Sequence, residues 1–220
     1  MQSLKLIAEI KTNITYPRKI IIRSLLRGIG KLVISSLFKI TISGKENLPT
    51  GGPLIVVGNH TAVMEAVLLT LYSPWQIEML GAADIPHEKI SQFFSDIYGY
   101  IPVNRGHLDR GALCSSLRVL EQKGIIGIFP EGGIWEPGLM RAQTGVSWLS
   151  YHGKTPVLPI GFSGTLGSID NALMLKRPNL TMQIGKQIPY LRKEKNIPRK
   201  VLFKQYAENV MTRVRGLLLP

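Results

Sequence analysis

Short apolar runs alternate with longer stretches of helical periodicity through the middle of the chain. Three apolar runs predict buried strands, at residues 54–57, 125–129 and 156–162. Three stretches of helical periodicity predict helices, at about residues 62–72, 87–97 and 108–123. This alternation predicts an α/β fold with a mostly parallel central sheet flanked by helices, whose active site lies at the carboxyl ends of the strands.

An amphipathic helix is expected before this region. A helix over residues 19–33 would carry a basic stripe on one arc and apolar side chains on the opposite arc, at about 100° per residue. The stripe consists of Lys19, Arg23, Arg27 and Lys31. Such a helix can lie in the membrane interface, because each basic group near an anionic surface contributes about 1 kcal/mol. The alternative is a helix that packs on its own domain and leaves its basic face in solvent.

The 220 residues are expected to form an arm and one domain. Residues 1–45 form the N-terminal amphipathic helical arm, which associates with a membrane, and residues 46–220 form the domain, including a basic C-terminal helix over about 199–217. Nine Lys or Arg stand against one acid in residues 1–45, and nine against two in residues 186–220, out of a net charge of +13. The basic ends predict anionic lipids at a membrane surface as a partner.

Composition and spacing exclude several classes of protein. Cys114 is the only cysteine and the four histidines show no zinc-site spacing, so we expect neither a disulfide nor a metal site. Aromatic residues make up 7% of the chain and do not accompany a basic cluster, so we expect no nucleic-acid partner. No apolar run approaches the roughly 18 residues of a membrane span, and the first residues lack a secretory pattern. We therefore expect a peripheral protein at the cytoplasmic face of a membrane.

A histidine and a carboxylate follow the first predicted strand. Gly58-Asn59-His60 ends that strand, and Glu65 falls near the start of the next helix. On one continuous helix, His60 and Glu65 would be about 140° apart and could not touch. If His60 lies in the turn and Glu65 in the first helical turn, the carboxylate reaches the imidazole and stays ionised near the helix N-terminus. The second ring nitrogen then acts as a general base toward a hydroxyl, for roughly 10²–10⁴-fold in rate.

Four blocks follow one another along the chain. They are Asn59-His60-x4-Glu65, Tyr100-Ile-Pro-Val-Asn-Arg105-Gly106, Ile128-Phe129-Pro130-Glu131-Gly132-Gly133 and Val157-Leu158-Pro159-Ile160. In this order they resemble the glycerolipid acyltransferase family, typified by lysophosphatidic acid acyltransferase, over about residues 40–185. The resemblance implies transfer of a fatty acyl group to a hydroxyl of a lysolipid such as 1-acylglycerol-3-phosphate, in phospholipid biosynthesis. The donor it implies is an acyl thioester of coenzyme A or acyl carrier protein, with no other cofactor.

The resemblance also implies roles for individual residues. His60 is the catalytic base, and Glu65 is its partner where the family has aspartate. Substrate binding falls to Asn59, Arg105, Gly106, Glu131, Gly132 and Pro159. Within this set, Arg105 matches the arginine that binds the acceptor phosphate, and Pro159 belongs to a strand that would wall the acyl channel.

Two departures from the family's pattern leave the acceptor open. Glu65 in place of aspartate adds about 1 Å of reach, and a misplacement of that size can lower a rate on the order of 10²-fold. Gly133-Ile134-Trp135 stands where the family has Thr-Arg-Ser, so an arginine that helps to hold the acceptor is absent. Two alternatives follow: an acyltransferase with a non-phosphate or glycolipid acceptor, and a non-catalytic membrane lipid-binding protein with an altered dyad.

Overall fold

A seven-stranded sheet forms the centre of the protein. The computed structural model describes residues 14–83, 97–104, 109–132 and 142–218. The strands are β1 (Lys39–Ser43), β2 (Leu54–Gly58), β3 (Glu78–Ala82), β4 (Ile101–Val103), β5 (Ile125–Ile128), β6 (Val157–Ser163) and β7 (Asn179–Ile184). They lie in the order β1-β7-β6-β2-β5-β3-β4, and all neighbouring pairs are parallel except β6 and β7. The predicted α/β class with a mostly parallel sheet is confirmed.

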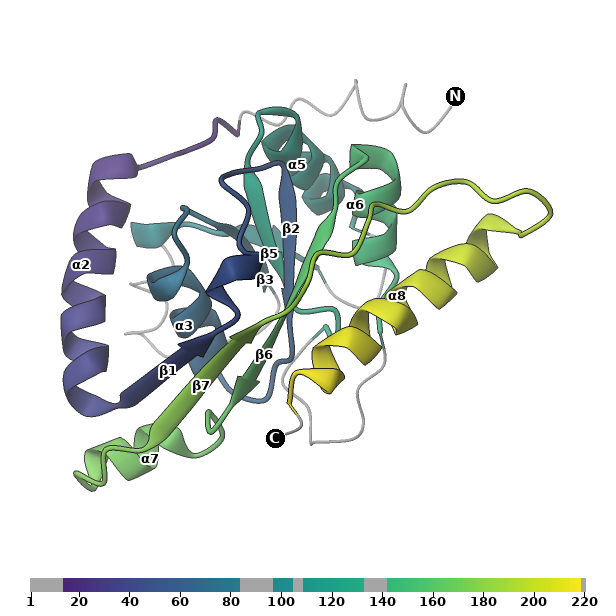
Figure 1. The fold of residues 1–220 in the computed structure, drawn as a ribbon. Coiled ribbons are helices and arrows are strands. Elements are labelled where there is room, and N and C mark those ends of the chain that lie inside the picture. The colour runs from purple at the N-terminus through teal and green to yellow at the C-terminus, as the bar shows by residue number, and fades with distance from the viewer. Residues whose placement is uncertain (1–13, 84–96, 105–108, 133–141, 219–220) are drawn as a thin grey trace.

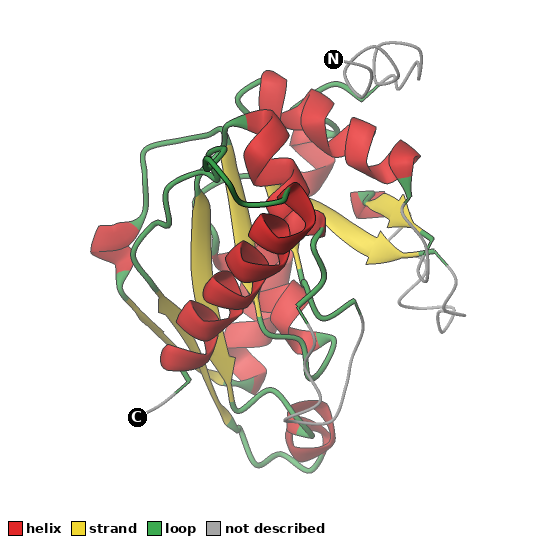
Figure 2. Ribbon diagram, turned by 90° about the vertical axis from the view of Figure 1, so that its right-hand side faces the viewer, coloured by secondary structure: helices red, strands yellow, loops and turns green. Residues whose placement is uncertain are grey.

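Helices cover both faces of the sheet (Figure 1). They are α2 (Ile20–Leu37), α3 (Met64–Tyr72), α5 (Arg110–Glu121), α6 (Gly145–Gly153), α7 (Ser168–Leu173) and α8 (Arg199–Gly216). One core cluster joins the sheet to α5, α6 and α8, and a second joins its other face to α3. Figure 2 shows the face covered by α8, which crosses in front of the strands.

The central strand β2 explains why the sequence pattern predicts this part of the fold well. All five of its residues are buried. Ile55 and Val57 belong to the core under α5, α6 and α8, whereas Leu54 and Val56 belong to the core under α3. Successive side chains of a strand point to opposite faces, so a strand covered on both faces is apolar throughout.

The predicted central elements are present in the structure, and the peripheral strands were not predicted. The three predicted strands correspond to β2, β5 and β6. The helices expected at about 62–72, 108–123 and 199–217 correspond to α3, α5 and α8. The helix expected at about 87–97 lies almost wholly outside the described residues. The pattern did not predict β1, β3, β4 or β7, which lie at or beside the two edges of the sheet.

Part of the expected N-terminal arm belongs to the domain. Residues 1–45 were assigned to the arm, but β1 falls within this range and forms one edge of the sheet. Its residues Lys39 to Ser43 pair in parallel with residues 179–183 of β7. α2 in turn packs on α3 and on β1. β1 is therefore part of the sheet of the domain, and α2 packs on the domain.

α2 packs with its basic stripe toward the domain. Arg23 is fully buried, and its Nη1 and Nη2 atoms donate to the Glu78 carboxylate of β3 at 2.5 and 2.9 Å. Its Nε atom donates to the carbonyl of Tyr98 at 2.9 Å. Arg27 donates to the carbonyl of Ser73. Arg23 therefore cannot contact a membrane surface, and the membrane-binding role predicted for it is wrong, because its charge is neutralised inside the protein.

The two ends of the stripe remain exposed but also contact the domain. Lys19 donates from Nζ to the carbonyl of Ile97 at 3.0 Å. The Nζ atom of Lys31 lies 5.9 Å from the centre of the Tyr72 ring. The stripe as a whole thus attaches α2 to the protein, which differs from both expected arrangements.

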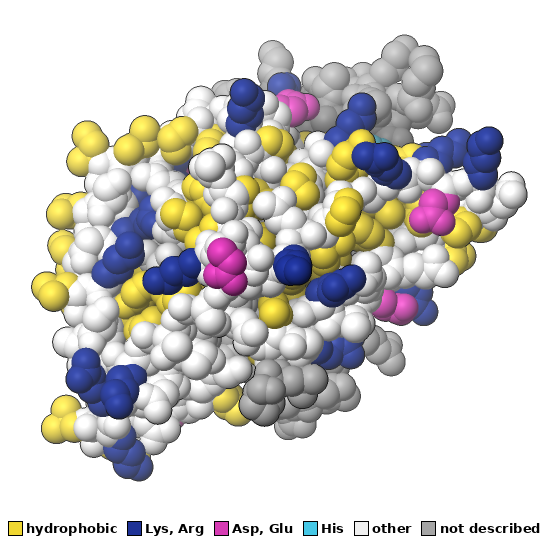
Figure 3. Space-filling view, in the orientation of Figure 1, with side chains coloured by type: hydrophobic (Ala, Val, Ile, Leu, Met, Phe, Trp, Pro, Cys, Tyr) yellow, Lys and Arg dark blue, Asp and Glu magenta, His cyan; other side chains and the backbone are white. Residues whose placement is uncertain are grey.

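The apolar arc of α2 faces outward instead. Its exposed side chains are Ile20, Ile21, Ile22, Leu25, Ile29, Leu32, Val33 and Leu37. Ile21 is 83% exposed and Leu32 is 75% exposed. In the space-filling view of Figure 3, hydrophobic side chains project along the edge formed by α2. Within the described residues, no helix has the length and apolar composition needed to cross a membrane.

Candidate active site

Side chains from several loops meet at the carboxyl edge of the central strands. Asn59 and His60 follow β2, Glu131 follows β5, and Thr165 follows β6. Because β6, β2 and β5 are neighbours, the loops after them are also neighbours. α3 begins at the same edge and supplies Glu65 from its first turn. This is the edge at which the alternation of strands and helices predicted the site.

His60 is held on several sides in the turn after β2. Its ring stacks on Phe129, with 4.2 Å between ring centres and 10° between ring planes. Its Nδ1 atom lies 3.5 Å from Oε2 of Glu65, and its backbone N–H donates to Oε2 of Glu131 at 3.1 Å. The side chain keeps 17% of its surface exposed. With Nδ1 facing Glu65, Nε2 on the other side of the ring is the nitrogen left for a substrate.

Glu65 is fully buried and lies where the sequence placed it, with its carboxylate turned back toward His60. It accepts from the backbone N–H groups of Thr61 and Ala62 at 3.2 and 2.8 Å. Burial acts to raise the pKa of Glu65, but hydrogen bonds from His60, Thr165 and Thr61 outweigh it, so the pKa lies below its ordinary value. The carboxylate is therefore ionised at neutral pH and can fix the tautomer of the imidazole.

Two hydroxyl groups also hold the Glu65 carboxylate. Thr165 donates from Oγ1 to Oε1 of Glu65 at 2.5 Å, and Thr61 donates to the same oxygen at 2.7 Å. Thr165 is buried and lies just after β6, far from Glu65 in the sequence. The sequence pattern did not identify either threonine. Thr61 follows His60 directly, which was a usable signal, whereas nothing in the sequence marks Thr165.

Glu131 stabilises the turn that contains His60. It is buried beside the dyad and accepts the backbone N–H of His60. Burial raises the pKa of Glu131 to about 7, although the hydrogen bond from His60 lowers it. The charge of Arg215, at the end of α8, also lowers this pKa, so a cation that the sequence pattern did not mark lies near the site. Gly132 follows with a φ of 72°, in the left-handed region that favours glycine.

Asn59 and Pro159 form hydrogen bonds with the backbone of neighbouring segments. The Nδ2 atom of Asn59 donates to the carbonyl of Phe162 at 3.0 Å, and the N–H of Phe162 donates to Oδ1 of Asn59 at 2.8 Å. The buried amide thus ties the end of β2 to β6 instead of facing a substrate. Pro159 is buried in β6, opposite Val57 of β2, and its carbonyl accepts the N–H of Gly185 at 2.9 Å. The structure gives both residues a place in the framework that supports His60.

Some predicted site residues lie outside the described part of the chain. Arg105 and Gly106 belong to residues 105–108, and the Gly133-Ile134-Trp135 segment belongs to residues 133–141. The acceptor-binding role expected of Arg105 stays a prediction. Among the described residues, no group of three or more His, Cys, Asp or Glu side chains is placed to hold a metal ion.

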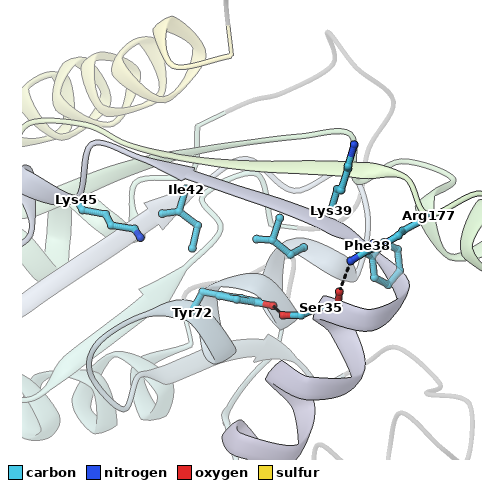
Figure 4. Close-up of a pocket in the computed structure, with 8 residues that line it drawn as sticks. Ser35, Phe38, Lys39, Ile42, Lys45, Tyr72 and Arg177 are labelled. Atoms are coloured by element: carbon cyan, nitrogen blue, oxygen red, sulfur yellow. Dashed lines mark hydrogen bonds between the residues drawn. The ribbon is translucent and has the colours of Figure 1, made fainter.

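An open groove of about 480 Å³ lies between the end of α2 and β1 (Figure 4). It is lined by Ser35, Phe38, Lys39, Ile40, Ile42, Lys45, Tyr72 and Arg177. The floor is apolar, and three cationic side chains surround it. Arg177 donates to the carbonyl of Ser35 at 3.1 Å, and the hydroxyls of Ser35 and Tyr72 are 2.7 Å apart. His60 and Glu65 are not part of this lining, so the groove is separate from the dyad.

The fold and the site together define a class of protein: an α/β enzyme with a histidine–carboxylate pair at the carboxyl edge of its sheet. The acyltransferase family model matches residues 39–163, more than half of the chain. The chain belongs to the acyltransferase family. The match includes His60, Glu65 and Glu131, and it ends at the last residue of β6.

Relatives and a solved structure agree with this family. The 1-acyl-sn-glycerol-3-phosphate acyltransferase of Bacillus subtilis is 22% identical over 160 residues, 72% of this chain and 78% of that protein. The 1-acyl-sn-glycerol-3-phosphate acyltransferase of Borreliella burgdorferi is 26% identical over 130 residues, 58% of this chain and 52% of that protein. The crystal structure of the 1-acyl-sn-glycerophosphate acyltransferase PlsC from Thermotoga maritima matches with a TM-score of 0.62 at 17% identity. That match covers 98% of this chain and 86% of the other, and it shows that the folds are alike.

Proposed function

We propose that the protein transfers a fatty acyl group from a thioester to a hydroxyl of a lysolipid, such as 1-acylglycerol-3-phosphate, at a membrane surface. The observation that carries this proposal is the position of His60. Its Nδ1 atom faces a buried, ionised carboxylate, and part of its ring remains exposed at the carboxyl edge of the sheet. A neutral imidazole held in this way is a general base for a hydroxyl.

The reaction proceeds by direct attack, without a covalent enzyme intermediate. Nε2 of His60 takes the proton from the acceptor hydroxyl as its oxygen attacks the thioester carbonyl. The resulting imidazolium is stabilised by Glu65, which stays ionised. The tetrahedral intermediate then expels the thiolate, and His60 returns the proton to its sulfur. One C–S bond breaks and one C–O bond forms, so an ester and a free thiol are the products.

The acceptor is proposed from the family and from the relatives. Both named relatives are 1-acyl-sn-glycerol-3-phosphate acyltransferases. A phosphate on the acceptor suits Arg105, whose guanidinium can bind phosphate oxygens in a charge-assisted, bidentate manner. The donor is an acyl thioester of coenzyme A or acyl carrier protein, as the resemblance implies. The proposed reaction is a step of phospholipid biosynthesis.

The membrane is proposed as a partner from the exposed apolar arc of α2. Contiguous exposed apolar surface on a folded protein marks an interaction site. An interfacial helix buries such a face at the boundary of headgroups and acyl chains. The protein would thus bind the membrane peripherally, through the apolar arc of α2 and not through its buried arginine.

One departure from the family's motifs favours a second class of acceptor. Gly133-Ile134-Trp135 replaces the Thr-Arg-Ser of the family's third block, so a cation that helps to hold a phosphate is absent. A glycolipid or another non-phosphate alcohol is the alternative acceptor. Labelled acyl thioesters offered with a panel of lysolipids and glycolipids, with products identified by mass, separate the two classes.

The proposal is tested by changing His60→Ala. Loss of the general base should lower acyl transfer on the order of 10²–10⁴-fold while the protein stays folded, because the ring lies at the edge of the core. His152→Ala is the matched control, since His152 lies in α6, away from the dyad. Near-full activity of the folded His60→Ala protein would contradict the mechanism. A wild type that binds lysolipids without transferring acyl groups would point to the non-catalytic alternative.

A further inference from the structure

The connection between β6 and β7 carries a second exposed apolar surface. It includes α7 and the turn that follows α7. Its exposed apolar side chains are Leu166, Ile169, Leu173, Met174 and Leu175, which we call the α7 tip. Leu173 is 78% exposed and Leu175 is 88% exposed. Single exposed apolar residues are common, but five exposed apolar residues within ten positions are a local concentration of the kind found at interaction sites.

The α7 tip is held in place by packing and by backbone hydrogen bonds. Ala172 is buried in the core under α3 and anchors the helix. The N–H groups of Leu175 and Lys176 donate to the carbonyls of Ala172 and Asn171 at 2.9 and 3.0 Å. Leu175 itself has a φ of 59°, a left-handed conformation that costs an ordinary residue roughly 1 kcal/mol. This backbone holds an apolar side chain outward at the end of the connection.

Cationic side chains border the α7 tip. Lys176 and Arg177 follow it directly and are exposed, and Lys39 pairs opposite residue 179 at the start of β1. Asp170 is the single acid between residues 164 and 177. In Figure 3, Lys and Arg side chains gather at the lower left, where Figure 1 places α7. An apolar patch bordered by cations fits the boundary between anionic headgroups and acyl chains.

The tip is joined both to α2 and to the catalytic pair. Arg177 donates to the carbonyl of Ser35 near the end of α2, so the two apolar surfaces are linked at that point. At the other end of the connection, Thr165 immediately precedes the tip and donates to Glu65. The α7 tip therefore lies at the same edge of the sheet as the dyad, beside the end of α2 (Figure 1).

We infer that the α7 tip inserts into the surface of an anionic bilayer and forms, with the apolar arc of α2, a two-point membrane contact that holds the catalytic edge against the bilayer. The inference rests on the proposed function, because a lysolipid acceptor resides in the bilayer. Two contacts fix the orientation of the domain, whereas α2 alone would leave it free to pivot about the helix axis. The acceptor then reaches His60 without leaving the membrane surface.

Fluorescence of a tryptophan introduced at the tip tests insertion, measured as the difference from wild type, which contains three native tryptophans. With Leu175→Trp, emission should shift to shorter wavelength, and lipid-borne quenchers should reduce it, when vesicles of phosphatidylcholine and phosphatidylglycerol are added. Val201→Trp is the matched control, because Val201 is an exposed apolar residue on α8. Emission from the Leu175→Trp protein that matches the control overturns the inference. A shift that instead follows protein concentration without lipid assigns the tip to contact with a second copy, and also overturns it.

A variant tests the functional consequence. Leu173→Ser, Met174→Ser and Leu175→Ser combined should weaken partition into the anionic vesicles at least about tenfold, because these exposed side chains supply the buried apolar area. Transfer to a water-dispersed, short-chain lysolipid should stay at the wild-type rate, whereas transfer to a vesicle-embedded lysolipid should fall. Wild-type partition of the variant overturns the inference and leaves the enzyme proposal intact. Absence of transfer by wild type to either acceptor overturns the enzyme proposal, while the vesicle partition still reports on the tip.

Discussion

Glu65 carries one methylene more than the aspartate of the family's motif, and its surroundings match that length. Its carboxylate extends far enough to accept from Thr165 across the site while it also faces His60. Thr61 donates to the same oxygen as Thr165, so the carboxylate is fixed from three directions. The hydroxyl groups of Thr61 and Thr165 thus accommodate the longer side chain by donating hydrogen bonds to its carboxylate. The departure from the family's pattern is confined to this contact.

Substitutions at Glu65 should separate charge from reach. Glu65→Gln keeps the shape but loses the charge, so it should lose most of the activity, because nothing then stabilises the imidazolium. Glu65→Asp keeps the charge but draws the carboxylate back by about 1 Å, away from Thr165, and should lower kcat by up to roughly 10²-fold. Steady-state kinetics at neutral pH should rank wild type first, Asp second and Gln last. Equal activity of wild type and Glu65→Gln would show that Glu65 only stabilises the turn before α3, through Thr61 and Ala62.

Thr165 should act as a positioning residue for the dyad. Thr165→Val removes the O–H donor at nearly constant volume, so the pKa of Glu65 should rise and the acidic limb of the pH–rate profile should move toward higher pH. Thr165→Val should lower kcat and leave KM little changed. Thr165→Ser, which keeps the hydroxyl, should retain most of the wild-type kcat. A merely structural residue would change thermal stability without moving the pH profile, and that outcome would contradict the role.

At the scale of elements, one buried ion pair attaches α2 to the sheet. Glu78 is buried in β3 and meets both Arg23 and Arg18, with the Nε atom of Arg18 at 2.8 Å. The Arg23 guanidinium also lies 4.4 Å from the centre of the Tyr98 ring. Because these contacts occupy the basic side of the helix, the apolar side is left to face outward. The orientation of the proposed membrane surface therefore follows from this ion pair.

Breaking the ion pair between Arg23 and Glu78 should weaken the attachment of α2 to the sheet. Arg23→Met leaves Glu78 buried with only Arg18 beside it, and should lower the free energy of unfolding by about 3 kcal/mol. Hydrogen exchange should increase over residues 20–37 more than in the central strands. Lys204→Met breaks an exposed pair with Glu208 and should cost less than about 1 kcal/mol. Equal effects of the two changes would show that the buried pair does not hold the helix.

At the scale of the whole molecule, Glu131 should make stability depend on pH. Its pKa is about 7 in the folded protein, against about 4.5 for an ordinary glutamate. Between these values the folded state keeps a proton that the unfolded state has released, so stability falls as pH rises through this window. Glu131→Gln removes the titration and keeps an oxygen that can accept from His60. Its stability relative to wild type should therefore increase from pH 5 to pH 8.

Chemical unfolding across this pH range measures the effect. Glu46→Gln is the control, because Glu46 is exposed in the 3-10 helix Lys45–Asn47 and its substitution should leave the pH dependence unchanged. A difference between Glu131→Gln and wild type that stays constant with pH would show that Glu131 titrates normally in the folded protein.

The sequence by itself determined the class of fold and the proximity of His60 and Glu65. Strands buried on both faces are apolar throughout, so β2, β5 and β6 could be predicted from local pattern alone. His60 and Glu65 are five residues apart across a strand-to-helix turn, so their contact depends on local backbone geometry. Elements and contacts set by neighbours in sequence are the ones that a single sequence specifies.

The tertiary structure decided what depends on partners distant in sequence. Periodicity gave α2 two faces, but only the buried carboxylate of Glu78 decided that the basic face packs inward, since an unpaired buried charge would be costly. Thr165 reaches Glu65 only because β6 lies beside β2 in the sheet. β1 forms an edge of the sheet and β7 lies beside it, and the two depend on pairing with each other more than on their own pattern. The outward face of α2 and the α7 tip follow from the same packing, because exposure is a property of the folded surface and not of the residues alone.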